Sequence, residues 1–133
     1  MGLDSIWHVP EGVEHPKLQV SLCGGMFSGP SDGQCISFRG KVYSDFIQEV
    51  TGFTLYEDTI TGEELEALVE SLANFKDGLD KAGQGYGRVI YLRETFGKNP
   101  DESLEYGLND LSDLLTMFEA YASIEGAELK SWY

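Results

Sequence analysis

The strongest constraint on the fold is a helix start at residues 60–65, which read Ile60-Thr61-Gly62-Glu63-Glu64-Leu65. This pattern is a capping box, in which the Thr61 hydroxyl accepts from the Glu64 N–H and the Glu64 carboxylate accepts from the Thr61 N–H. Ile60 and Leu65 occupy the positions of a hydrophobic staple. Apolar residues then recur with the spacing of one helix face, at Leu65, Leu68, Val69, Leu72 and Phe75. We therefore predict a helix over residues 62–76.

The first half of the chain mixes strand and helix periods. We predict a short strand in the first ten residues, followed by an irregular arm. Alternating apolar residues predict strands at 18–22 and 36–38, on either side of a glycine-rich segment. From Val42 to Val50 the spacing becomes helical, and Gly52 follows where a C-terminal cap is expected. Phe53 and Leu55 then predict another short strand.

The second half begins with a second glycine-rich segment, residues 78–87, which predicts a loop. Residues 88–93 (RVIYLR) predict a buried strand, with the start of a helix as the competing interpretation. Pro100 suits the first position of a new helix. Apolar residues at helical spacing continue to Gly126, with Gly107 as a break, and the last residues predict a final strand.

These elements predict one α+β domain spanning residues 1–133. We expect a small, mostly antiparallel sheet packed against two or three helices, which cover one of its faces. The 133-residue length is enough to bury a core without the help of disulfide bonds or bound metal. Cys23 and Cys35 are the two cysteines, and we interpret them as free thiols in a reducing cytosol; a contact between them, if the segment between forms a hairpin, stays open.

The net charge of −14 argues against a nucleic-acid binder and against an anionic-membrane binder, because both need a basic face. No apolar stretch approaches the ~20 residues of a membrane span, and no secretory signal is recognisable. Residues 53–133 hold 17 of the 23 acidic residues. These acids indicate either a solvated face or a surface that imitates nucleic-acid phosphates and occupies a basic protein.

Catalytic and metal motifs are weak. The carboxylates of Glu57, Asp58, Glu63 and Glu64 are close in sequence but lack the calcium-loop pattern. No phosphate-binding loop, dinucleotide fingerprint or nucleophile elbow occurs, and His8 is the histidine that we weigh as a general base. We therefore expect no catalytic residue, no metal and no cofactor.

Aromatic and basic residues near the predicted loops favour a different chemistry. A nucleotide is held well by an aromatic ring under its base and a guanidinium on its phosphate. The alternative is that these side chains merely cover the sheet edge. The aromatic candidates are Trp7, Phe27, Tyr86 and Tyr91, and the basic ones are Arg39, Lys41, Arg88 and Arg93.

Four short blocks stand out: Met1-Gly2-Leu3-Asp4; Gly25-Met26-Phe27-Ser28 with Phe38-Arg39; Ile60-Thr61-Gly62-Glu63-Glu64-Leu65; and Gly126-Ala127-Glu128-Leu129. Together they resemble a group of small phage and prophage proteins that begin with MGLD. The chain departs from that group at Gly24, where a histidine is expected, and at Glu57-Asp58-Thr59, where Asp-Gly is expected. The resemblance implies a bacterial-virus protein acting in the host cytosol, where such proteins often counteract host defences.

The expected function is non-enzymatic sequestration of a small nucleotide-derived immune signal. The expected ligand-binding residues are Asp4, Trp7, Phe27, Ser28, Arg39 and Arg93. The alternative is an acidic inhibitor that binds a host defence protein as a nucleic-acid mimic, and a third hypothesis is a nucleotide-hydrolysing enzyme using His8 or the Glu57–Glu64 carboxylates. We expect no direct nucleic-acid partner and no membrane, and homo-oligomerisation stays open.

Overall fold

The structure is a computed structural model that describes residues 4–16, 26–28, 35–56, 59–98 and 101–132. Its strands are β1 (Asp4–His8), β2 (Met26–Ser28), β3 (Cys35–Phe38), β4 (Thr59–Thr61) and β5 (Glu128–Trp132). Its helices are α1 (Gly40–Thr51), α2 (Gly62–Ala82), α3 (Tyr86–Phe96), α4 (Glu102–Asn109) and α5 (Leu111–Ala122). The predicted α+β class is confirmed. The strand predicted at 18–22 and Cys23 lie outside the described residues.

The strands form one antiparallel sheet in the order β2-β3-β1-β5-β4. Strand β1 lies at its centre and pairs with β5 along its whole length, from Asp4 opposite Trp132 to His8 opposite Glu128. The strand predicted at the end of the chain is therefore confirmed. Because the first and last strands pair, the sheet forms only when both ends of the sequence come together.

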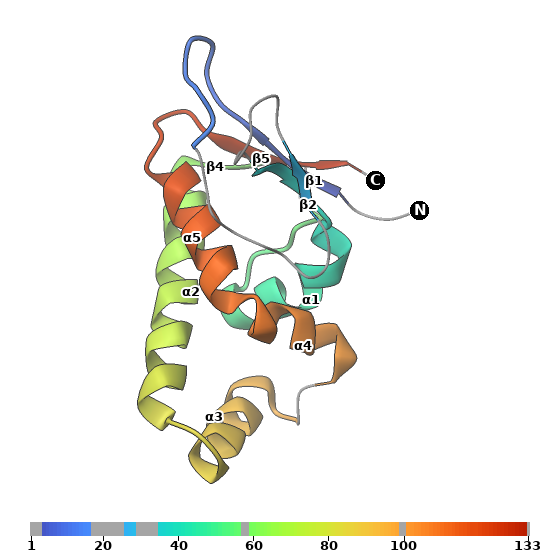
Figure 1. The fold of residues 1–133 in the computed structure, drawn as a ribbon, viewed down its shortest axis with the longest axis vertical. Coiled ribbons are helices and arrows are strands. Elements are labelled where there is room, and N and C mark those ends of the chain that lie inside the picture. Colours follow the sequence, from blue (N-terminus) through green and yellow to red (C-terminus); the bar gives the residue numbers. More distant parts are fainter. Residues whose placement is uncertain (1–3, 17–25, 29–34, 57–58, 99–100, 133) are drawn as a thin grey trace.

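One face of the sheet is apolar and packs on helices. Trp7 lies opposite Leu129, which in turn lies opposite Ile60, and all three side chains are buried. The Trp7 ring stacks on Tyr121 of α5, with centroids 4.2 Å apart and planes 1° from parallel. Phe38 of β3 contacts the rings of Tyr43 and Phe118, which belong to α1 and α5. Figure 1 shows the sheet across one end of the helices, with α3 at the opposite end.

Helix α1 forms as its periodicity predicts, with Tyr43, Phe46 and Ile47 buried on one side. It ends at Gly52, whose φ of 80° is left-handed and whose N–H donates to the carbonyl of Gln48. The strand predicted at Phe53 and Leu55 is wrong, because this segment pairs with no other strand. The chain instead pairs one segment later, as β4 on the edge beside β5.

Helix α2 starts at Gly62 as predicted but continues to Ala82, six residues past the predicted end. The staple residues Ile60 and Leu65 are both buried, whereas the Thr61 side chain makes no capping hydrogen bond. The expected loop from residue 78 therefore begins only at Gly83. Gly78 lies within this helix, and the Tyr91 ring of α3 fills the space where a Cβ of residue 78 would lie.

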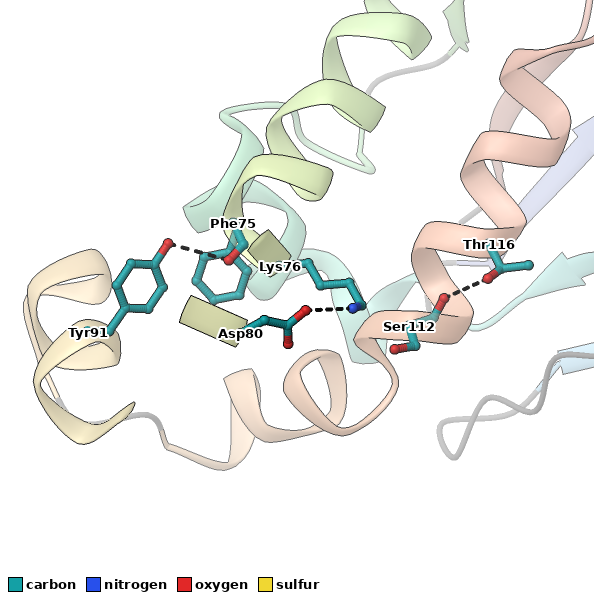
Figure 2. A network of polar contacts seen from close by, with 6 residues as sticks. All are labelled: Phe75, Lys76, Asp80, Tyr91, Ser112 and Thr116. Carbon is teal, nitrogen blue, oxygen red and sulfur yellow. Dashed lines mark hydrogen bonds and ion pairs between the residues drawn. The ribbon is translucent and has the colours of Figure 1, made fainter. Parts of the chain in front are cut away.

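The strand predicted over residues 88–93 is wrong, and the competing helical interpretation is right, since these residues form the middle of α3. Leu92 and Phe96 are buried on one side of this helix. Tyr91 lies beside them and packs on α2, where its hydroxyl makes a long hydrogen bond of 3.4 Å to the carbonyl of Phe75 (Figure 2). The β-branched and aromatic content of this run is outweighed by packing, because the helix buries Leu92 and Phe96 and places the rings of Tyr91 and Phe96 against Phe75 of α2.

Residues 104–122 are helical as predicted, but the break falls at Asp110, between α4 and α5, and the break predicted at Gly107 is wrong. Gly107 lies inside α4, where it packs directly on the Phe46 ring of α1. A Cβ at this position would overlap the ring. The glycine therefore lets α1 and α4 approach each other closely.

Replacing Gly107 with alanine should destabilise the protein by about 1–3 kcal/mol, because the new methyl group overpacks the core against Phe46. At an open helical site the same change would stabilise by up to about 1 kcal/mol. Thermal and urea unfolding would measure the difference, with the exposed Glu105→Ala as a control on the same helix. A Gly107→Ala variant as stable as the wild type would contradict the close contact.

Candidate functional site

A cleft with a volume of about 550 Å³ lies between α1 and α4. Tyr106 and Val42 supply its apolar wall, and the Tyr106 side chain is 39% exposed. The charged residues of its lining are Lys41 and Asp45 from α1, Asp101, which directly precedes α4, and Glu102. The cleft therefore combines an accessible aromatic ring with three carboxylates and one ammonium group.

The core directly below fixes the shape of this cleft. Asp45 and Tyr106 are the sequence neighbours of Phe46 and Gly107, the pair that brings α1 and α4 into contact. A second tie lies one helical turn before Phe46 on α1 and three residues after Gly107. There the Tyr43 hydroxyl donates a 2.6 Å hydrogen bond to the Asp110 carboxylate, and both groups are buried. Because the two helices are tied at successive points, their cleft-lining side chains are held at a set separation.

The electrostatics of the cleft favour a cationic guest. Asp45, Asp101 and Glu102 are exposed at its rim, and the carboxylate of Asp101 lies 3.2 Å from the Lys98 ammonium. The 28 residues from 101 to 128 carry eight acidic and no basic residues. A basic side chain can lay its apolar stem along Val42 and Tyr106 while its charge meets the carboxylates.

Two smaller clefts lie elsewhere on the described surface. One of about 240 Å³ lies between the start of α2 and the end of α5, and includes Leu65 and Glu125. The other, of about 320 Å³, lies between α3 and α4 and is lined by Arg88, Leu92 and Glu105, among others. Each is less than two-thirds the volume of the α1–α4 cleft and lacks an aromatic ring in its lining.

The residues expected to bind a nucleotide are partly brought together. Asp4 is on β1, while Phe27 and Ser28 are on β2, two strands away across β3. Arg39 directly follows β3 and is exposed. The backbone thus gathers these four positions on neighbouring strands of the sheet.

The other two expected residues are corrected by the structure. Trp7 is 2% exposed and stacked on Tyr121, so its ring is part of the core and offers no surface to a ligand. Its Nε1 and the Ser5 hydroxyl are buried without a hydrogen-bond partner among the described residues. Arg93 lies on α3, at the opposite end of the molecule from the sheet (Figure 1), because residues 88–93 form a helix. Arg88 and Tyr86 are displaced from the sheet for the same reason.

The residues weighed for catalysis come from β1 and from the start of α2, which are aligned across β5 because His8 and Thr61 both lie opposite Glu128. His8 is exposed at the end of β1, whereas Glu63 and Glu64 are exposed on the first turn of α2; residues 57–58 lie outside the described part. His15 is half-buried, and its Nδ1 lies 2.7 Å from the Tyr121 hydroxyl. Within the ranges described, no group of three or more histidines, cysteines and carboxylates is arranged to hold a metal ion.

The sequence indicated only part of the α1–α4 cleft. The excess of acidic residues beyond position 100 is visible in the sequence, and Asp101 and Glu102 belong to it. Nothing in the sequence joined them to Lys41, Val42 and Asp45, which lie some 60 residues earlier. A local signal was Tyr106, an aromatic residue that lies off the apolar repeat of Leu104, Leu108 and Leu111.

The comparisons with known proteins add no relative: no protein-family model matches this chain, and neither a curated protein nor a solved structure does. Among the helices of the described residues, none is both long and apolar enough to cross a membrane.

His15 should make the stability of the fold pH-dependent. Burial lowers the pKa of His15 from its ordinary value, and the nearby charge of His8 lowers it further. The unfolded chain then binds a proton more readily than the folded one, so stability is full above pH ~6.5 and falls as the pH drops through the lower folded pKa. Between pH 7 and pH 5, the melting temperature of the wild type should fall further than that of the His15→Gln variant.

His8→Gln serves as the control for this measurement. Because burial is the main cause of the shift, most of the pH dependence should survive in that variant. If the melting temperatures of the wild type and the His15→Gln variant fell equally with pH, the pH dependence could not be assigned to His15.

Proposed function

We propose that this protein is a non-enzymatic binding protein that holds a basic protein partner in the α1–α4 cleft. The observation that supports this proposal best is the lining of the cleft, with three carboxylates beside an exposed tyrosine ring. An arginine side chain fits both features, because its guanidinium pairs with carboxylates and stacks on aromatic rings. The acidic surface of α4 and α5 would extend this contact and accelerate association.

The resemblance to MGLD phage proteins supplies a biological setting for this proposal. A phage protein with an acidic helical face can occupy the basic surface with which a host defence protein binds nucleic acid. In this setting the partner is a basic host protein and the place of action is the host cytosol.

A direct test uses an arginine-rich peptide as the probe. Titration of the peptide should perturb backbone amide signals at residues 41–45 and 101–106, and added salt should weaken the binding. Asp45→Lys with Glu102→Lys should raise the dissociation constant at least about tenfold, since each reversal replaces attraction with repulsion. Glu63→Lys with Glu64→Lys is the matched control, because it changes the net charge equally but lies on α2, outside the cleft.

Two outcomes would overturn the proposal. If the control reversal weakens binding as much as the cleft reversal, the peptide responds to net charge rather than to the cleft. If affinity is insensitive to salt and to both reversals, the acidic surface has no part in binding.

A second candidate function is sequestration of a nucleotide-type signal, favoured by the placement of Asp4, Phe27, Ser28 and Arg39 on neighbouring strands. A nucleotide held at 100 times its dissociation constant stabilises the folded state by about 2.7 kcal/mol, which raises the melting temperature by several degrees. Arg39→Ala should abolish that shift. A panel of cyclic and linear nucleotides that leaves the melting temperature unchanged would remove this candidate.

A further inference from the structure

Helix α3 presents an apolar face to solvent. Tyr86 is 76% exposed, Val89 40% and Ile90 37%, and these are three of the most exposed large apolar residues in the described chain. Their spacing of three and four residues puts them on one side of the helix. Leu92 and Phe96 hold α3 to the protein, and Val89 lies one turn before Leu92, so the exposed face borders the buried side of the helix.

The same helix carries a net positive charge, whereas the protein as a whole is strongly negative. Residues 86–96 contain two basic residues and one acidic residue, a net charge of +1, while the rest of the chain contains seven basic and 22 acidic residues, a net charge of −15. Arg93 is exposed and lies one turn beyond Ile90, next to the apolar face. The exposed face of α3 is therefore apolar with an arginine at its edge, in a protein whose other residues are mainly acidic in net charge.

The α1–α4 cleft is complementary to this face in both respects. Its apolar wall is Val42 and Tyr106, and its rim carries Asp45, Asp101 and Glu102. We infer that the exposed face of α3 binds the α1–α4 cleft of a second copy of this chain. An acidic surface on a different protein would cover only the α3 face. In a contact between two copies of this chain, one interface covers the α3 face of one copy and the cleft of the other.

Such a contact joins two different surfaces, so it is a head-to-tail interface. A head-to-tail interface leaves one free α3 and one free cleft at the ends of every assembly, and the assembly grows unless a ring closes. The inference rests on the proposed function in that it treats the cleft as a receptor for basic and apolar groups. It adds regulation, because a neighbouring copy in the cleft competes with the outside partner.

Complementation between two variants tests this geometry. The α3 variant, Ile90→Asp with Arg93→Glu, keeps an intact cleft. The cleft variant, Asp45→Lys with Glu102→Lys, keeps an intact α3. By sedimentation velocity at low salt, the wild type should form species of at least twice the chain mass, and each variant alone should be a monomer. An equimolar mixture should form a one-to-one dimer that grows no further, because only one compatible pair of surfaces remains.

Glu63→Lys with Glu64→Lys is the matched control and should associate like the wild type, since it changes the charge without touching either surface. Circular dichroism confirms that each variant is folded. A wild type that stays monomeric at every concentration, or a mixture of variants that gives no dimer, would overturn the inference. If the wild type is monomeric but still binds the arginine-rich peptide in its cleft, the inference fails and the proposed function stands. If it self-associates but does not bind the peptide, the proposed function fails and the self-association stands.

Discussion

The helical layer depends on the packing of one side chain, Phe46. Its ring fills the space above Gly107 of α4 and lies 5.8 Å from the ring of Phe75 on α2 and 6.3 Å from that of Phe96 on α3. Four helices therefore meet at one aromatic residue. Since Asp45 precedes Phe46 and Tyr106 precedes Gly107, the same packing determines how far apart the two walls of the α1–α4 cleft stand. The candidate site is thus a consequence of the core directly beneath it.

A second aromatic cluster attaches the sheet to the helices. Trp7 stacks on Tyr121 and meets Phe118 edge-on, with ring centroids 5.4 Å apart in the second contact. This use of Trp7 explains why an aromatic residue near the start of the chain gives no ligand platform. Among the described residues, the strands supply two of the eight buried aromatic side chains, Trp7 and Phe38, and both meet Phe118 of α5 edge-on.

The distribution of charge unites the two proposals. A core of apolar rings leaves the acidic residues on the outer faces of α2, α4 and α5, so most of the surface is negative. Helix α3, with Arg88 and Arg93 against Glu94, carries a net positive charge and lies at the end of the molecule remote from the sheet (Figure 1). Both proposals rely on attraction between a positive group and the carboxylates of the cleft, so on these proposals a basic partner and the α3 face of a neighbouring copy would compete for one site. Ion pairs within α2, such as Lys76 with Asp80 at 2.9 Å (Figure 2), neutralise charge locally and leave this polarity unchanged.

The sequence by itself determined the local elements whose cause is local. The start of α2, the left-handed end of α1 at Gly52 and the α+β class follow from staple residues, a glycine and apolar periodicity within a few positions. Only the tertiary structure decided whether residues 88–93 would be strand or helix, because Val89 and Ile90 suit either and the burial of Leu92 and Phe96 against distant helices selects one. It likewise converted Gly107 from a break into a packing surface, placed Trp7 in the core, and joined Asp45 to Glu102 in one cleft. Each of these depends on a partner that the fold brings from far along the chain, and sequence periodicity reports only which side of an element is buried, never what lies against it.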